Sequence, residues 1–403
     1  MRGSRWLIRI LTPSLAHALK VFETINDRGV GLNAMDLLKN LLFMRTVADR
    51  HDLLKGRWKE LVDTLSGCGE KPLRFLRYFI MSRYPLDTGK DVIREDDIYQ
   101  WLSDHQRLAG IEAKPLEFLD ELVANGRAYA RFAQAMNSAG TPNRYLSNIT
   151  VLSGAARQHF ILLLAGQHLP EDAFDELARQ LENLYFCYLI TREPTKNFET
   201  NFTKWSPELR AVTDRAGVDV FVSKRLTPDR LFRKNAFDFA IRELAQDKLP
   251  KYRMRYVLAK LTQFVDQDAF GNQAGYSLQG YLDSSVHIEH ILPQTPSFDV
   301  AAVFDKPTEY NQYVAKLGNL TLLEKTINSA VSNNVYAEKC PGYLQSQFLL
   351  TKSLAERPQF GQNTQLNRAT ESLKQFTTWL SKDIADRQEM LIALARRAWD
   401  MPE

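Results

Sequence analysis

A glutamate, a histidine and two asparagines in the C-terminal half have the side chains needed to hydrolyse a phosphodiester. Glu289 and His290 are adjacent at the end of an apolar run, and Asn319 and Asn328 follow downstream. Histidine can take a proton from water because its pKa lies near neutrality. A carboxylate with an amide oxygen suits Mg²⁺, which keeps several waters and substrate phosphates among its ligands. These four residues are the candidate catalytic and metal-binding set.

The elements that would position this set follow one another as strand, loop, strand and helix. Residues 286–292 are apolar and β-branched, which predicts a strand ended by Pro293. Residues 317–323 predict a second strand whose start is weakened by Gly318, and a helix is expected from 324 to about 329. This is the order of a ββα-metal nuclease site.

The adjacency of Glu289 and His290 sets a geometric condition. Neighbouring strand residues point to opposite faces, so the two can act together only if the strand ends or bulges there. His287 shares the Glu289 face and is a candidate further ligand, with a supporting or surface role as the alternative. Taken alone, the Glu–His pair would more simply be buried and hydrogen-bonded. The downstream asparagines favour the nuclease.

Two motifs carry a resemblance to a known family. They are Ile288-Glu289-His290-Ile291-Leu292-Pro293-Gln294 and Leu317-Gly318-Asn319-Leu320-Thr321-Leu322-Leu323, followed by Asn328 and Lys339. The constellation resembles the HNH, or His-Me finger, nucleases, and most closely the C-terminal domain of GmrSD-type type IV restriction endonucleases.

The resemblance implies a role for each matched residue. His290 would be the general base, and Asn319 would hold the His290 loop or imidazole in orientation. Glu289 and Asn328 would bind one Mg²⁺ or Mn²⁺ ion. Lys339 would lie near the phosphate or support the ligands.

A second resemblance concerns the N-terminus. Residues 21–32 and 36–40 are similar to the end of the ParB-like nucleotidase domain of the same family, whose Asp-Gly-Gln-Gln-Arg motif is absent here. We therefore expect residues 1–48 to be a remnant of that domain, with no nucleotide-binding residues and no NTPase activity. A separate nucleotidase subunit or upstream domain is then an open partner, as is a second copy of the chain.

Helical periodicity dominates the rest of the sequence, with short polar joins that predict a mainly α protein built as a multi-helix bundle. We expect a helical middle domain over 49–219, a small nuclease module within 220–345 and further helices over 346–403. The basic segment 251–260 and Arg192 are candidate contacts to DNA phosphates; a solvated face and a helix-end cation are the simpler interpretations.

Composition sets outer bounds. The chain has 403 residues and a net charge of only +4, so a nucleic-acid partner would need a local basic surface. Three dispersed cysteines fit a reducing cytoplasm and no disulfide or structural zinc framework. No apolar run is long enough for a membrane span.

The sequence thus predicts a metal-dependent DNA endonuclease, and the resemblance implies a place in restriction of modified or phage DNA. A non-catalytic DNA-binding or assembly subunit of a defence complex is the alternative. A helical interaction protein without nucleic-acid affinity is a third.

Overall fold

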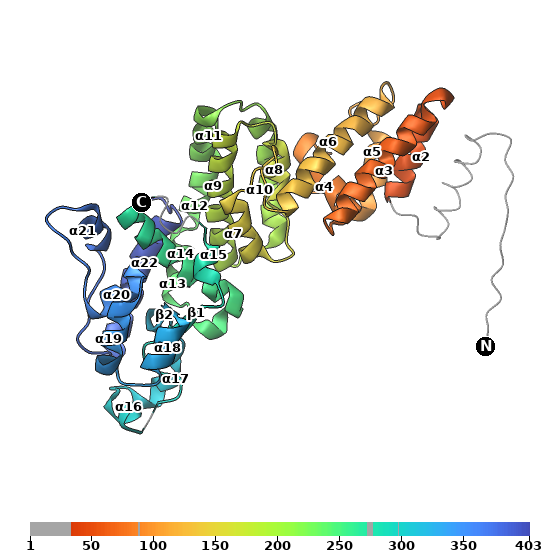
Figure 1. The fold of residues 1–403 in the computed structure, drawn as a ribbon. Coiled ribbons are helices and arrows are strands. Elements are labelled where there is room, and N and C mark those ends of the chain that lie inside the picture. Colours follow the sequence, from red (N-terminus) through yellow and green to blue (C-terminus); the bar gives the residue numbers. More distant parts are fainter. Residues whose placement is uncertain (1–33, 88, 272–276, 297) are drawn as a thin grey trace, which may run out of the picture. The chain divides into compact units, whose positions relative to one another are not determined.

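The computed structural model describes residues 34–87, 89–271, 277–296 and 298–403, so most of the expected nucleotidase remnant over residues 1–48 lies outside it. The described residues are mainly helical, as predicted, and contain one two-stranded sheet (Figure 1). No helix among them is both long and apolar enough to cross a membrane.

The chain divides into two compact units. The first is built from the chain up to Pro142, with Gln158–Phe174 and Thr195–Arg215 added, and the second from Asn143–Arg157, Asp175–Pro194 and Ala216–Glu403.

The first unit is helical throughout its described regular elements. These are α2 (Ala34–Arg45), η1 (Ala48–Arg50), α3 (His51–Gly67), α4 (Pro72–Arg83), η2 (Glu95–Asp97), α5 (Ile98–Asp104), α6 (Pro115–Ala133), α8 (Phe160–Ala165) and α10 (Thr195–Arg210). In α2, Leu37, Leu38, Leu41 and Leu42 are buried, as the helical spacing of the leucines predicts.

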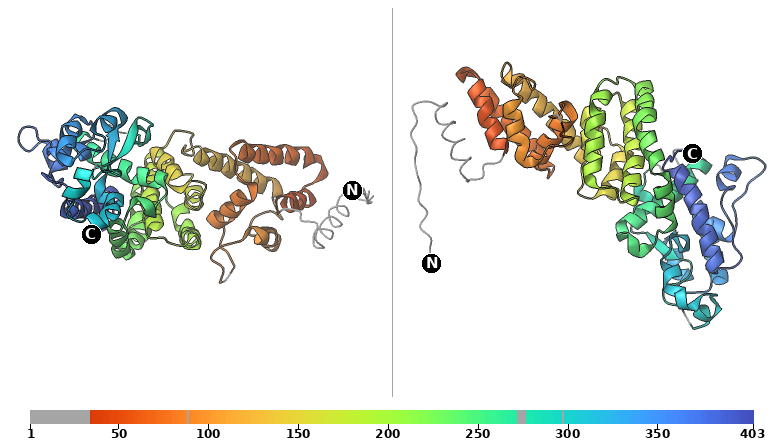
Figure 2. Two further views of the ribbon diagram at one scale, coloured as in Figure 1. Left: turned by 90° about the horizontal axis from the view of Figure 1, so that it is seen from below. Right: turned by 180° about the vertical axis from the view of Figure 1, so that it is seen from behind.

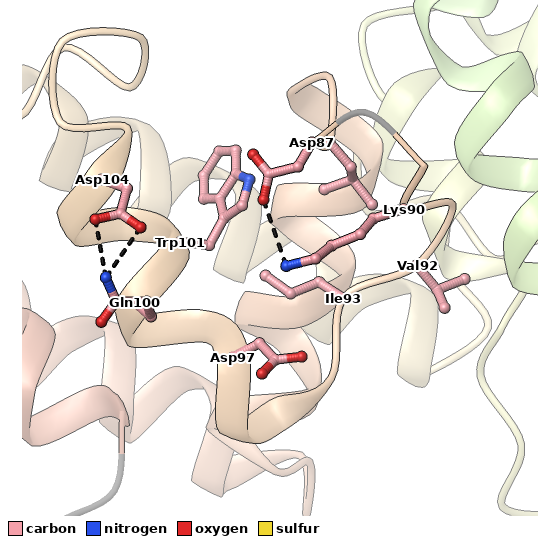
Figure 3. Close-up of a pocket in the computed structure, with 9 residues that line it drawn as sticks. Asp87, Lys90, Val92, Ile93, Asp97, Gln100, Trp101 and Asp104 are labelled. Carbon is pink, nitrogen blue, oxygen red and sulfur yellow. Dashed lines mark hydrogen bonds and ion pairs between the residues drawn. The ribbon is translucent and has the colours of Figure 1, made fainter.

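A small pocket in this unit lies beside Trp101 (Figure 3). Asp87 and Lys90 pair across 3.5 Å at its edge, and Gln100 is hydrogen-bonded to Asp104. Its volume of about 70 Å³ holds a few waters at most. The pocket is therefore too small for a nucleotide.

The second unit holds the sheet and the remaining helices (Figures 1 and 2). They are α7 (Arg144–Ser153), α9 (Glu171–Ile190), α11 (Arg215–Phe221), the π-turn η3 (Val222–Leu226), α12 (Thr227–Phe232), α13 (Lys234–Arg242), η4 (Gln246–Lys248), α14 (Lys251–Phe270), α15 (Gln279–Leu282), β1 (Val286–His290), α16 (Phe298–Val303), η5 (Pro307–Glu309), α17 (Tyr310–Ala315), η6 (Leu317–Asn319), β2 (Leu320–Glu324), α18 (Lys325–Val331), α19 (Tyr336–Gln345), α20 (Leu349–Ala355), α21 (Gln365–Thr370) and α22 (Ser381–Ala398).

The two strands pair antiparallel, with Glu289 opposite Thr321 and His290 opposite Leu320. Both are shorter than expected. β1 ends at His290 rather than at 292, and residues 317–319 form the 3₁₀ turn η6 instead of the start of β2. The reason for the second difference lies at Gly318, whose backbone packs so closely on α22 that a Cβ there would stand 2.3 Å from the Ile384 carbonyl oxygen.

The surroundings of the sheet are helical. Helix α18 packs on both strands, and α14 and α20 pack on β2. An apolar core that includes Leu323, Val331, Tyr343 and Ile384 joins β2 to α18, α19 and α22. β1 therefore lies in a packed framework and ends at a defined point.

Candidate active site

His290 is the last residue of β1, and its ring is held by a side chain from outside the two expected motifs. Nε2 lies 2.6 Å from Oε1 of Gln246 in η4. A carboxamide oxygen can only accept a hydrogen bond, so Nε2 carries the proton in this arrangement. The lone pair of the neutral imidazole is then on Nδ1, the nitrogen available to take a proton.

The surroundings of His290 keep its imidazole neutral. Burial lowers the pKa of His290 to about 4, and the positive charge of Lys339 acts in the same direction. The Lys339 ammonium also donates to the His290 carbonyl oxygen at 2.8 Å. At neutral pH the side chain is thus in the form that a general base requires.

Asn319 fastens the chain that leaves β1. Its Oδ1 accepts from the Leu292 backbone N–H at 2.6 Å, and its Nδ2 donates to the Leu292 carbonyl oxygen at 3.0 Å. The backbone N–H of Ile291 donates to the Asn319 carbonyl oxygen at 3.0 Å. Asn319 is completely buried. It therefore fixes the two residues directly after His290, and no hydrogen bond joins it to the imidazole.

Helix α22 and the segment before it brace Asn319 from the other side. Trp379 Nε1 donates to Asn319 Oδ1 at 2.8 Å. The buried guanidinium of Arg387 donates to the carbonyl oxygens of Gly318 and Leu320 at 2.8 and 2.7 Å, and Gln388 Oε1 accepts from the Gly318 N–H. The C-terminal helix is thus part of the structure that positions the site.

Glu289 is buried, and its two oxygens have different surroundings. Oε1 accepts from Lys339 Nζ at 2.7 Å and from the Tyr343 hydroxyl at 2.9 Å, both on α19. No described side chain donates to Oε2. Burial raises the pKa of Glu289 and lowers that of Lys339, and their contact opposes both shifts. Lys339 is only 1% exposed, which favours the supporting role over a phosphate contact.

Asn328 and His287 stand apart from these contacts. Asn328 lies half-buried on α18, which packs on β1, and His287 is half-buried opposite Leu323. Neither side chain forms a hydrogen bond with the described residues. Within the described ranges no three His, Cys, Asp or Glu side chains group as metal ligands. The candidate metal ligands are therefore Oε2 of Glu289 and the side-chain amide of Asn328, and His287 lies on the same strand as Glu289.

The sequence motifs do not include several residues that hydrogen-bond to Glu289, His290, Gly318 and Asn319. Gln246 lies far upstream in a short turn, and Tyr343, Trp379, Arg387 and Gln388 come after both motifs. Only Tyr343 had a local signal, since it stands one helical turn after Lys339 and so shares its face.

Comparison with known proteins places the site within one family domain. Residues 231–394 match the GmrSD restriction endonucleases, C-terminal domain. No curated protein matches the chain. The matched range contains β1, β2, α18, α19 and most of α22, hence every contact of Glu289, His290 and Asn319 described above. This family indicates a nuclease in restriction with DNA as its substrate. The likeness to the C-terminal domain of GmrSD restriction endonucleases thus holds over residues 231–394.

Proposed function

We propose that this protein is a metal-dependent DNA endonuclease of the HNH, or His-Me finger, type. The observation that carries the proposal is the arrangement at the end of β1. There a neutral histidine with its proton directed to Gln246 adjoins a buried carboxylate whose Oε2 receives no side-chain hydrogen bond from the described residues. A base next to a cation ligand is what hydrolysis of a phosphodiester requires.

His290 is the proposed general base. Its Nδ1 takes a proton from the attacking water, while Gln246 holds the Nε2–H and keeps the ring in one tautomer. Asn319 keeps the following backbone in place, so the imidazole cannot rotate away with the loop. The water oxygen forms a new bond to phosphorus, and the bond between phosphorus and the leaving oxygen breaks.

Glu289 and Asn328 are the proposed ligands of one divalent cation. Oε2 of Glu289 is the oxygen that Lys339 and Tyr343 leave open, and the Asn328 amide makes no hydrogen bond with described residues. Two oxygen ligands suit Mg²⁺ or Mn²⁺, because such ions take waters and substrate phosphate oxygens for their remaining positions. When bound there, the ion would stabilise negative charge on the phosphate and the leaving oxygen.

Nicking of supercoiled plasmid over a Mg²⁺ titration tests the metal assignment. Asn328→Ala should raise the Mg²⁺ concentration for half-maximal rate by at least about tenfold. Mutation of a residue that only hydrogen-bonds to a metal ligand already lowers metal affinity by that factor, and loss of a ligand should cost no less. Asn334→Ala removes an exposed asparagine just beyond α18 and should leave the titration unchanged. Equal titrations for both variants would remove Asn328 from the site.

The alternative is a non-catalytic DNA-binding or assembly subunit. It predicts that wild-type protein retards DNA in a gel yet leaves plasmid intact at every Mg²⁺ and Mn²⁺ concentration.

A further inference from the structure

The second unit, which holds the sheet, also contains a groove beside the segment that carries Gln246. It measures about 780 Å³ and is lined by the end of α9, by α13 and by residues of 244–253. Ligand sites in proteins commonly have volumes of about 300–1,000 Å³. None of the residues with proposed roles in the reaction lines it.

Three cations line this groove: Arg192 just after α9, Lys248 in η4 and Arg253 in α14. Arg192 is exposed and has no ion pair or hydrogen bond from its guanidinium to the described residues. Arg253 donates through Nε to the Leu152 carbonyl oxygen at 3.2 Å. Glu243 is the one acidic lining residue and lies 3.6 Å from Lys248. The lining carries a net positive charge, which suits phosphates.

The basic residues of segment 251–260, at the start of α14, have different partners. Arg255 donates to the carbonyl oxygens of Leu282, Asp283 and Val286, and Lys260 pairs with the buried Glu182. Both are therefore structural. Arg253 is the member of the segment whose side chain reaches the groove.

An exposed aromatic ring completes the groove. Phe239 on α13 is 64% exposed although it lines the groove, and Leu189 and Leu249 add apolar surface. A helix that already buries Phe237 and Ile241 needs no second aromatic in water for its stability. Cations combined with an aromatic platform are how proteins hold unpaired nucleic-acid strands, with phosphates on the cations and bases stacked on the ring. An apolar peptide would leave the cations without partners.

The groove is tied to the general base through the chain itself. Lys248 is two residues after Gln246, a span of at most about 7 Å. The segment is fastened to the Asn319 loop, because Leu317 N–H donates to the Leu244 carbonyl oxygen at 2.9 Å and Ala245 bridges to Lys316. The groove therefore lies beside the segment that holds the His290 ring.

We propose that this groove binds one strand of the DNA substrate next to the phosphodiester that is cut. Arg192 and Lys248 contact its phosphates, and Phe239 stacks on an unpaired base. The assignment rests on the proposed nuclease function for the position of the cut and deepens it, because it names locally unpaired DNA as the form that is bound.

DNA binding by the full-length His290→Ala protein tests the assignment, with labelled single-stranded and duplex oligonucleotides followed by fluorescence anisotropy. Phe239→Ala should weaken single-strand binding about five- to tenfold, the lower part of the range for base stacking. Arg192→Gln with Lys248→Gln should reduce the slope of log affinity against log salt by about one to two. Phe360→Ala and Lys382→Gln, which alter exposed residues outside the groove, should change neither.

Photocrosslinking locates the strand independently. A single strand containing 5-iodouracil should crosslink to the tryptic peptide spanning 235–242, which contains Phe239. Crosslinks only elsewhere, together with unchanged affinity in Phe239→Ala, overturn the groove assignment. If these variants fail to respond while wild type still nicks plasmid, the nuclease stands without the groove. If the variants and crosslinks respond as expected while wild type cuts nothing, the groove stands and the nuclease fails. If no DNA binds, both are wrong.

Discussion

At the scale of single residues, the site depends on how hydrogen bonds are divided among atoms. Lys339 and Tyr343 both use one oxygen of Glu289, and Gln246 uses one nitrogen of His290. In each case the other atom has no side-chain partner among the described residues. In the proposed mechanism the supporting side chains therefore decide which atom of each functional group faces the substrate.

Gln246 should matter for turnover more than for binding. Gln246→Leu removes the acceptor for the Nε2–H, so kcat should fall about tenfold, the worth of roughly one hydrogen bond, with KM little changed. Gln246→Glu keeps an acceptor there and should retain most of kcat. Single-turnover and steady-state kinetics separate the two constants. Equal losses in both variants, or a change in KM alone, would contradict this positioning role.

The Glu289–Lys339 pair should dominate local stability. Lys339→Met leaves a buried carboxylate without its cation and should destabilise the unit by about 3–5 kcal/mol. Adding Glu289→Gln should recover part of that loss, because a neutral amide does not need the ammonium. Urea unfolding of the two single variants and the double variant measures the coupling. Strictly additive losses would show that the pair does not act as a unit.

At the scale of elements, the local pattern of apolar residues predicts β1, β2 and α18 in their observed order. Val286, Ile288 and the leucines of residues 320–323 favour strands, and the mainly α class was predictable from helical periodicity. The η6 turn was not, because it arises from contact with α22 far along the chain. At Gly318 the hydrogen bonds to Arg387 and Gln388 of α22 favour a turn over the strand that local propensity predicts.

Gly318 should be the most restrictive position of that contact. In Gly318→Ala the new Cβ would stand 2.3 Å from the Ile384 carbonyl oxygen, so η6 or α22 must move and the Asn319 contacts with them. We expect a loss of about 1–3 kcal/mol, as for other overpacked sites, with a fall in nuclease activity. Gly280→Ala meets nothing within 4 Å and is the matched control. Similar stability and activity for both variants would show that the close approach is unimportant.

At the scale of the whole molecule, the nuclease unit is larger than its motifs. The family match runs to residue 394 and so includes most of α22, whereas the sequence motifs lie within residues 288–339. Gln246, Trp379 and Arg387 could not be found from the motifs because only folding brings them to β1 and η6. The proposed binding groove depends equally on tertiary structure, since only folding brings Arg192 and Arg253 to line one groove.

Asp266 should make the stability of this unit depend on pH. Its carboxylate is buried on α14 and accepts from Tyr281 and from the Leu349 backbone, and burial raises its pKa from 3.8 to about 6. The folded state therefore holds the proton more tightly than the unfolded chain. This contribution is fully present below pH 4 and is lost as pH rises to about 6, amounting to roughly 3 kcal/mol.

Asp266→Asn isolates that contribution. The stability of the variant relative to wild type should improve by roughly 3 kcal/mol between pH 3 and pH 7, whatever fixed cost the lost hydrogen bond adds. Urea unfolding at the two pH values gives the comparison. A difference between variant and wild type that is the same at both would show that Asp266 ionises normally.

The most direct test of the central claim compares wild-type protein with His290→Ala in nicking of supercoiled plasmid with Mg²⁺, at DNA concentrations where both bind equally. Removing a general base should lower the cleavage rate about 10²- to 10⁴-fold without changing DNA affinity, and EDTA should abolish the wild-type rate. Equal rates for the two proteins, or a wild type that binds DNA and never cuts it in Mg²⁺ or Mn²⁺, would contradict the assignment of His290 as the base of a metal-dependent nuclease.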